Sequence, residues 1–167
     1  MTECNATEDQ CCSGFSYGID IGGSKIELVV FDDALQAVHR QRIETPQHDY
    51  DAFLDTVQAL VAGAAAAIGA MCETIGIALP GVRERATGRQ LSANVPALTG
   101  QQVGADLQAR LQRPLHLGND LQCFALSEAH GGSAAGYPSM YGAILGTGAG
   151  GGYCVEGRLI AGGNGIA

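Results

Sequence analysis

The chain has 167 residues, enough for one domain or two small lobes that bury about 70% of the surface of the unfolded chain. A net charge of −8 argues against a surface for nucleic acid or anionic membranes, which need clustered lysine and arginine. No stretch approaches the roughly 20 apolar residues that cross a bilayer, and the polar residues 1–13 lack the features of a secretory signal. The protein is therefore expected in the cytoplasm, with reduced cysteines.

The first half of the chain predicts an antiparallel meander, a helix and a buried strand. Residues 1–16 are predicted as a disordered tail. Strands are predicted at 17–21, 26–31, 37–44 and 74–79. Apolar residues at helical spacing predict a helix over 50–70, with Asp49 or Asp51 as its cap.

The second half alternates helices and strands. A polar stretch over 82–89 is predicted as an exposed hairpin or loop, in which Arg83, Arg85 and Arg89 are most simply solvated, a mobile lid near the substrate being the alternative. Helices are predicted at 103–111 and 121–129, and strands at 115–117, 140–145 and 153–160. The order βββαβαβα followed by a β-hairpin predicts an α/β fold with helices around a mixed sheet.

Two glycine-rich turns follow predicted strands, in Asp20-Ile-Gly-Gly-Ser-Lys25 and Gly146-Thr-Gly-Ala-Gly-Gly-Gly152. Glycines let the backbone approach a bulky anion, and main-chain N–H groups can then point at phosphate oxygens. A ligand-free hairpin turn would be the simpler interpretation of an isolated Gly-Gly, but two such loops favour phosphate binding. The second loop lacks the Gly-Lys-Ser/Thr ending of a Walker loop and precedes a strand, so it is not a dinucleotide fingerprint either.

A single acid stands out between these loops. Asp120 follows the short apolar run that ends at Gly118-Asn119. Two phosphate loops and one isolated carboxylate predict phosphoryl transfer to a small alcohol, with Asp120 as the candidate catalytic residue. The alternative is that Asp120 caps the following helix, and both roles can hold at once. The four histidines and six cysteines show no ligand spacing, so no protein metal site is predicted among them.

The order of these motifs resembles the amino-terminal lobe of the actin-like ATPase (ribonuclease H-like) superfamily, and more closely the ROK family of sugar kinases. The resemblance covers residues 17–167. Beyond the glycine loops and Gly118-Asn-Asp120, it rests on Gly76-Ile-Ala-Leu-Pro-Gly81, Ser92-Ala-Asn-Val-Pro96 and Cys123-Phe-Ala-Leu-Ser-Glu128. The last two segments look most like bacterial N-acetyl-D-glucosamine kinases, whereas Gly162-Gly163-Asn164-Gly165 is nearer to the fructokinase or mannokinase branch.

The resemblance implies ATP and Mg²⁺ as cofactors and a sugar as substrate, most closely N-acetyl-D-glucosamine phosphorylated at its 6-hydroxyl. It implies that Asp20 holds the water shell of Mg²⁺ and that Asp120 accepts the proton of the sugar hydroxyl. The residues implied to serve the ATP phosphates are Gly22, Gly23, Ser24, Lys25, Gly146, Thr147, Gly148 and Gly150. Those implied for the sugar are Gly81, Asn94, Asn119 and Asp120, although Asn94 is equally compatible with a turn residue before Pro96.

The resemblance further implies a Gly-Glu-x-Gly-His segment, a zinc motif and a carboxy-terminal lobe after residue 167. The chain is therefore expected to be a truncated kinase lobe or a gene fragment, with zinc only in the missing part and a homodimer at full length. The alternatives are a fructokinase or mannokinase, a non-catalytic sugar-binding module and a ROK-type transcription regulator. The regulator is disfavoured because the short acidic tail leaves no room for a winged helix before the first strand.

Overall fold

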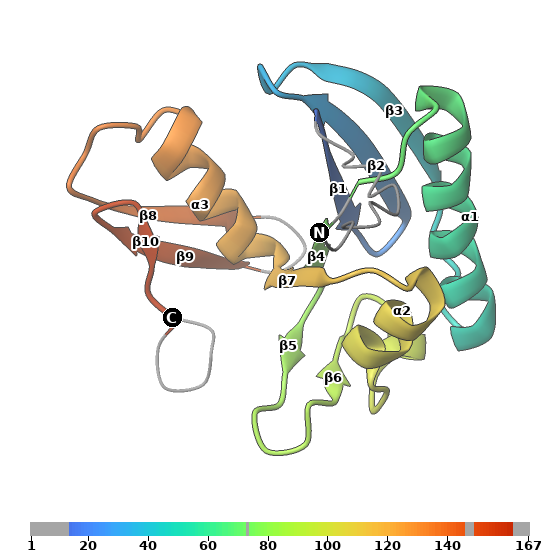
Figure 1. Ribbon diagram of the computed structural model, residues 1–167. Helices are drawn as coiled ribbons and strands as arrows, with labels where there is room; N and C mark the ends of the chain where they lie inside the picture. Colours follow the sequence, from blue (N-terminus) through green and yellow to red (C-terminus); the bar gives the residue numbers. More distant parts are fainter. Residues whose placement is uncertain (1–13, 73, 146–148, 162–167) are drawn as a thin grey trace, which may run out of the picture.

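The computed structural model describes residues 14–72, 74–145 and 149–161 (Figure 1). The helices are α1 (Tyr50–Ile68), α2 (Val103–Leu111), α3 (Asp120–Gly131) and the 3₁₀ turn η1 (Pro96–Leu98). The strands are β1 (Phe15–Ile21), β2 (Lys25–Asp32), β3 (Ala37–Glu44), β4 (Ile75–Leu79), β5 (Val82–Arg83), β6 (Gln90–Leu91), β7 (Leu115–Asn119), β8 (Ser139–Leu145), β9 (Ala149–Val155) and β10 (Arg158–Leu159). This order confirms the predicted α/β fold class.

The main sheet has five strands in the order β3-β2-β1-β4-β7. The first three strands form the predicted antiparallel meander, and β1, β4 and β7 run parallel. The carboxyl ends of these parallel strands therefore lie at one edge, where Asp20, Ala78 and Gly118 are in register. Ligands of open α/β sheets usually bind at such an edge.

One face of this sheet carries the hydrophobic core. Alternate strand residues such as Ile19, Leu28 and Ile77 pack against α1 and α2. The helix α1 contributes Phe53, Leu54, Val57, Leu60, Val61 and Ala64. By length and composition alone α1, with 19 residues, also qualifies as a candidate membrane span. Its buried stripe against the sheet is what a core helix shows.

The amino-terminal ends of α1 and α2 are tied by a side-chain hydrogen bond. The Tyr50 hydroxyl donates to Asp106 Oδ2 at 2.7 Å, and burial and then this acceptor raise the pKa of Tyr50. We expect Tyr50→Phe to lower the free energy of unfolding by about 1 kcal/mol, the usual net value of such a bond. Urea unfolding measures the change. The control is Tyr137→Phe, at a side chain that is 68% exposed, and equal stabilities of the two variants would contradict the assignment.

The second hairpin differs from the sequence prediction. Strand β9 begins at Ala149, so Gly150, Gly151 and Gly152 pair with β8 and are not part of a loop. A side chain on Gly150 would collide with Leu121, and one on Gly152 would come within 2.8 Å of the Ala125 Cβ. These glycines therefore let the hairpin pack closely on α3. Of the predicted phosphate loop, Gly146, Thr147 and Gly148 lie outside the described residues.

Candidate active site at the carboxyl ends of β1, β4 and β7

Asp20 lies at the end of β1 on the sheet face opposite α1. Across the sheet it pairs with Glu27 of β2, which in turn pairs with Arg42 of β3. Arg40 and Arg42 both form ion pairs with Glu27. The hydrogen bond from Arg42 is the main reason that the pKa of Glu27 lies below its usual range. Glu27 is thus neutralised within the meander, whereas Asp20 forms no such pair among the described residues.

Asp20, Asp120 and Cys123 come together although they are about 100 residues apart in the chain. The carboxyl of Asp20 stays exposed at the mouth of the site, but partial desolvation raises its pKa, and the charges of Asp120 and Glu27 raise it further. Burial likewise raises the pKa of the Cys123 thiol, followed by the charges of Asp120 and Asp20. Two carboxylates that form no ion pair with a described lysine or arginine suit a hydrated divalent cation.

This pair of acids is the feature that fits Mg²⁺. The described residues contain no group of three or more His, Cys, Asp or Glu side chains placed to hold a metal. A cation here would therefore keep water and phosphate oxygens as most of its ligands, which is the usual coordination of Mg²⁺ with a nucleotide.

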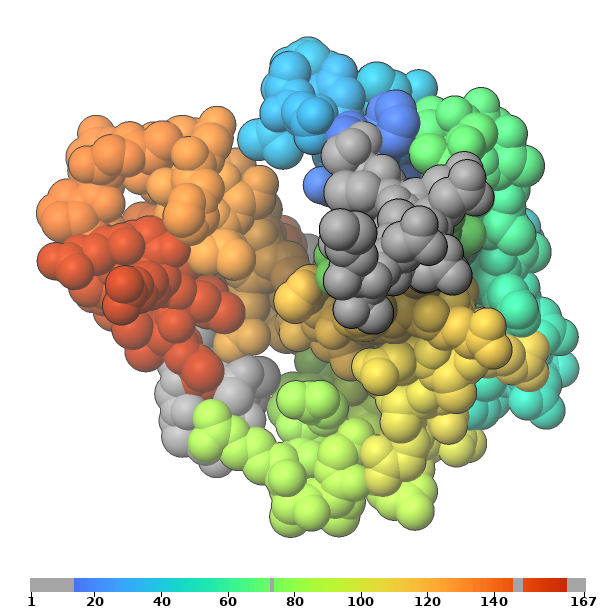
Figure 2. All heavy atoms as spheres, viewed as in Figure 1, coloured from blue at the N-terminus to red at the C-terminus, as the bar shows by residue number. Residues whose placement is uncertain are grey.

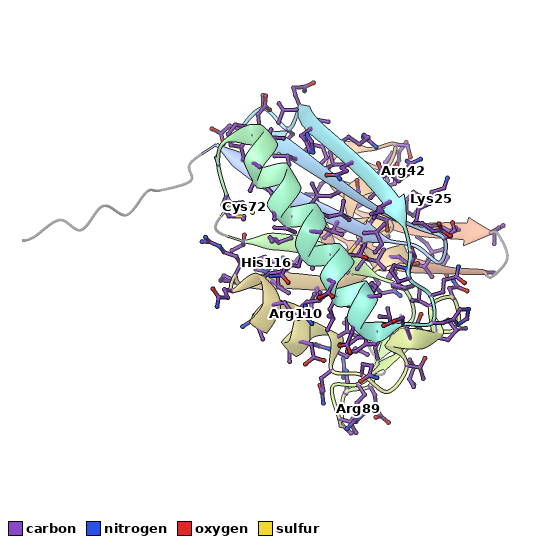
Figure 3. The ribbon with its side chains drawn as sticks, turned by 90° about the vertical axis from the view of Figure 1, so that its right-hand side faces the viewer. Lys25, Arg42, Cys72, Arg89, Arg110 and His116 are labelled. Atoms are coloured by element: carbon purple, nitrogen blue, oxygen red, sulfur yellow. The ribbon has the colours of Figure 1, made fainter. Side chains whose placement is uncertain are left out.

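The first glycine loop is a tight hairpin turn between β1 and β2. The Gly22 N–H donates to the Lys25 carbonyl at 2.9 Å, so the turn itself uses this amide. For Gly22 the hairpin interpretation therefore holds. The Lys25 side chain lies at the surface of the meander beside Arg42, opposite Glu44 (Figure 3). The structure does not bring it to Asp120.

The rest of this loop presents its amides on one side. Thr45 Oγ1 donates to the Gly22 carbonyl at 2.8 Å, and Gln47 Nε2 donates to the Gly23 carbonyl at 2.5 Å. Because a trans peptide points its N–H opposite to its carbonyl, the N–H groups of Gly23 and Ser24 face away from residues 45–47. Two neighbouring amides of this kind form an anion-binding concavity.

Asn119 positions the candidate base. Its Oδ1 accepts from the N–H groups of Leu121 at 3.0 Å and Gln122 at 3.4 Å, so Asn119 is the N-cap of α3. The alternative that Asp120 is the cap is therefore wrong, because Asp120 is already the first helical residue. Asp120 Oδ1 accepts from the Leu121 N–H at 2.9 Å, which leaves its second oxygen for a ligand.

Gly81 joins the end of β4 to this cap, since Asn119 Nδ2 donates to its carbonyl at 2.6 Å. Gly81 has a φ of +87°, and a Cβ there would collide with the Leu91 carbonyl and lie 2.9 Å from the Ser92 Cα. Glycine is therefore needed at this position because the backbone crosses closely here, and not because a substrate needs the space.

Asn94 lies on the other side, against the first glycine loop. Its Cβ and carbonyl oxygen both lie 3.2 Å from the position of a Cβ built on Gly23. The predicted sugar residue Asn94 is therefore a direct neighbour of the predicted phosphate residue Gly23.

Two cavities flank the end of β7. The first, about 650 Å³, is bounded by Asp20, Val29 and Phe31 of the meander and by Cys123 and Leu126 of α3. Figure 2 shows its opening between the blue meander and orange α3. The second, about 500 Å³ and more polar, includes Gly81, Asn119 and the β5–β6 hairpin.

Sequence reasoning missed several polar side chains around the site. Thr45 and Gln47 orient the glycine loop, and buried Gln90 donates to the Pro80 carbonyl at 2.8 Å. Thr45 and Gln47 follow the predicted strand at 37–44, but only the three-dimensional pairing of the loop with them reveals their role.

Comparison with known proteins assigns the chain to a family. The ROK family model matches residues 16–167, and the chain belongs to the ROK family. It spans about half the length of the curated relatives it matches. It is 50% identical over 147 residues to an N-acetyl-D-glucosamine kinase of Escherichia coli O139:H28, covering 87% of this chain and 48% of that protein. It is 47% identical over 151 residues to the N-acetylgalactosamine kinase AgaK of Shewanella sp. strain ANA-3, covering 90% and 48%.

Solved structures show the same fold. The ROK hexokinase of Thermus thermophilus matches with a TM-score of 0.81 at 29% identity, covering 90% of this chain and 50% of that one. A ROK family glucokinase of Streptomyces griseus, solved in complex with glucose and AMPPNP, matches with a TM-score of 0.80 at 28% identity, covering 92% and 48%.

Proposed function

We propose that this chain carries the phosphoryl-transfer site of an ATP-dependent sugar kinase. The observation that supports it most is the meeting of Asp20 and Asp120 at one sheet edge, beside a loop that turns the amides of Gly23 and Ser24 outward. The ROK family match and the kinase names of the relatives support the same function.

The proposed chemistry assigns one role to each group. Asp120 takes the proton of a sugar hydroxyl, whose oxygen attacks the γ-phosphorus of ATP while ADP leaves. Asp20 would hold the water shell of Mg²⁺, which would supply positive charge to the phosphates. The amides of Gly23 and Ser24 hydrogen-bond the phosphate oxygens. Asn119 donates the second proton of its Nδ2 to a sugar hydroxyl, because its Oδ1 already accepts two backbone hydrogen bonds. Asn94 hydrogen-bonds the sugar through its side-chain amide.

The proposed substrate is N-acetyl-D-glucosamine, phosphorylated at its 6-hydroxyl in the cytoplasm. The relative at 50% identity supports this sugar, and the AgaK relative makes its epimer N-acetylgalactosamine the second candidate. Residues 17–167 are proposed to act as the amino-terminal lobe of the kinase.

A coupled ADP-release assay over several sugars tests the function. We expect turnover of N-acetyl-D-glucosamine above that of N-acetylgalactosamine, fructose and mannose. Calorimetry without ATP separates the non-catalytic alternative: sugar binding with no ATP-dependent product from any of the four sugars would support a binding module and contradict the kinase proposal.

Asp20→Asn is expected to abolish the Mg²⁺-dependent part of AMPPNP binding and at the same time to stabilise the fold. A raised pKa means that the folded state holds the proton more tightly, so the ionised carboxylate costs stability at neutral pH. The gain in unfolding free energy should therefore be present at pH 7 and vanish below pH 3.8, the ordinary pKa of this side chain.

Calorimetry and urea unfolding measure the two effects of Asp20→Asn. Asp33→Asn, at an exposed acid in the β2–β3 turn, is the matched control. It should change neither the Mg²⁺-dependent binding of AMPPNP nor the free energy of unfolding. Unchanged Mg²⁺-dependent binding in Asp20→Asn would remove Asp20 from its role.

A further inference from the structure

The polar cavity beside Asn119 carries more positive charge than the rest of this acidic chain leads one to expect. Its walls include Arg83, Glu84 and Arg85 from the β5–β6 hairpin, together with Gly81 and Asn119. Two arginines and one glutamate leave a net positive charge, although the whole chain has 9 basic and 17 acidic side chains.

Backbone geometry directs Arg83 toward the sugar side of the site. Arg83 is two residues beyond Gly81, whose carbonyl accepts from Asn119. At about 3.3 Å per residue, its Cα is within about 7 Å of Gly81. Arg83 also pairs directly with Gln90 across the hairpin, so both side chains lie on the same face. Gln90 is buried in the cavity wall, which places Arg83 at its rim.

The hairpin that carries Arg83 is held firmly. The Glu84 N–H donates to the Arg89 carbonyl at 2.9 Å, and Gln102 Nε2 donates to the Thr87 carbonyl at 2.8 Å. The Glu84 carboxylate accepts from the Thr87 hydroxyl. Among the described residues, Arg83 itself has no ion pair or side-chain hydrogen bond, so its guanidinium is available to a ligand.

We propose that this cavity is a subsite for a carboxylate on the sugar substrate, with Arg83 as its counter-ion. The inference rests on the proposed sugar-kinase function and extends the substrate class from N-acetyl-D-glucosamine to N-acyl amino sugars with a carboxylate substituent. A guanidinium matches a carboxylate with two parallel hydrogen bonds. Glu84 in the same wall limits the net charge, which favours a monoanion over a phosphate dianion.

Calorimetric titration of the full 167-residue chain tests the subsite. N-acetylmuramate, which carries a carboxylate, is compared with the neutral N-acetylglucosamine. We expect N-acetylmuramate to bind about tenfold more tightly, as one charge-assisted contact predicts, and the difference to shrink as NaCl is added. Arg83→Gln should remove the preference. Arg113→Gln, at an exposed arginine outside the cavity wall, should keep it.

Several results would overturn the subsite. Equal affinity for the two sugars, or a preference that survives Arg83→Gln, would contradict the carboxylate subsite. The proposed kinase function would stand in either case if N-acetylglucosamine still binds. Binding of free lactate as tight as that of N-acetylmuramate would show a general anion site instead of a sugar subsite. Failure of both sugars to bind would contradict the inference and the proposed function together.

Discussion

Asp120→Asn is expected to lower kcat for sugar phosphorylation about 10²- to 10⁴-fold, the usual contribution of a positioned base. Asparagine keeps the size and hydrogen-bonding shape of the side chain but cannot accept the hydroxyl proton. The fold should persist because the cap of α3 is Asn119, and within the described residues the Asp120 side chain accepts a single hydrogen bond, from the Leu121 N–H. Steady-state kinetics with the coupled assay measure the loss.

Glu128→Gln is the matched control for this prediction. Glu128 is an acid on the same helix, but its carboxylate accepts from the N–H and hydroxyl of Ser133, which hold its pKa below the usual range. We expect the kcat of Glu128→Gln to stay near that of the unsubstituted chain. If Asp120→Asn keeps full turnover, or if both variants lose it equally, Asp120 is not the base.

Gly81→Ala is expected to destabilise the fold most, lowering the free energy of unfolding by about 2 to 4 kcal/mol. Alanine would adopt an unfavourable backbone conformation here, and its Cβ would collide with the Leu91 carbonyl. Because the Gly81 carbonyl accepts from Asn119, the same change should displace the cap beside Asp120 and weaken sugar binding. Urea unfolding and calorimetry measure the two losses.

Gly69→Ala separates the collision from the backbone cost. Gly69 ends α1 with a φ of +76°, yet a Cβ there would meet nothing within 4 Å. Gly69→Ala should lower the free energy of unfolding by only about 1 kcal/mol, the cost of a left-handed conformation for a residue with a side chain. Similar losses in the two variants would show that the crossing at Gly81 is not as tight as described.

The sequence predicted the parts of the fold that depend on local patterns. The apolar alternation of β1 to β3 and the helical spacing in α1 were enough for the meander and the core helix, and Asp49 is the cap of α1, accepting from the Ala52 N–H at 2.9 Å. The bounds predicted for β3 and α2 agree with the structure. The sequence also singled out Asp20 and Asp120, and the structure places the two carboxyls close enough for the charge of Asp120 to raise the pKa of Asp20.

The misjudged parts depend on contacts between segments far apart in the chain. Gly150 and Gly152 read as loop residues because glycine is typical of turns, but they pair with β8 as strand residues, and their close contact with α3 is what leaves no room for a side chain. The sequence offered Asp120 as the cap of α3 because aspartate caps helices well, but the helix starts one residue earlier than predicted, so that Asn119 is the cap. Likewise, only the folded chain shows that Thr45 and Gln47 orient the glycine loop.

We propose that nucleotide phosphates at Gly23 and Ser24 and a sugar hydroxyl at Asp120 share one site. Paramagnetic broadening of amide NMR signals by Mn²⁺·AMPPNP can show whether they do, with Mg²⁺·AMPPNP as the diamagnetic reference. We expect broadening at Gly23, Ser24, Asp120 and Leu121, and none at Tyr137 or at the end of α1. Broadening at the glycine turn without any at Asp120 and Leu121 would contradict a shared site.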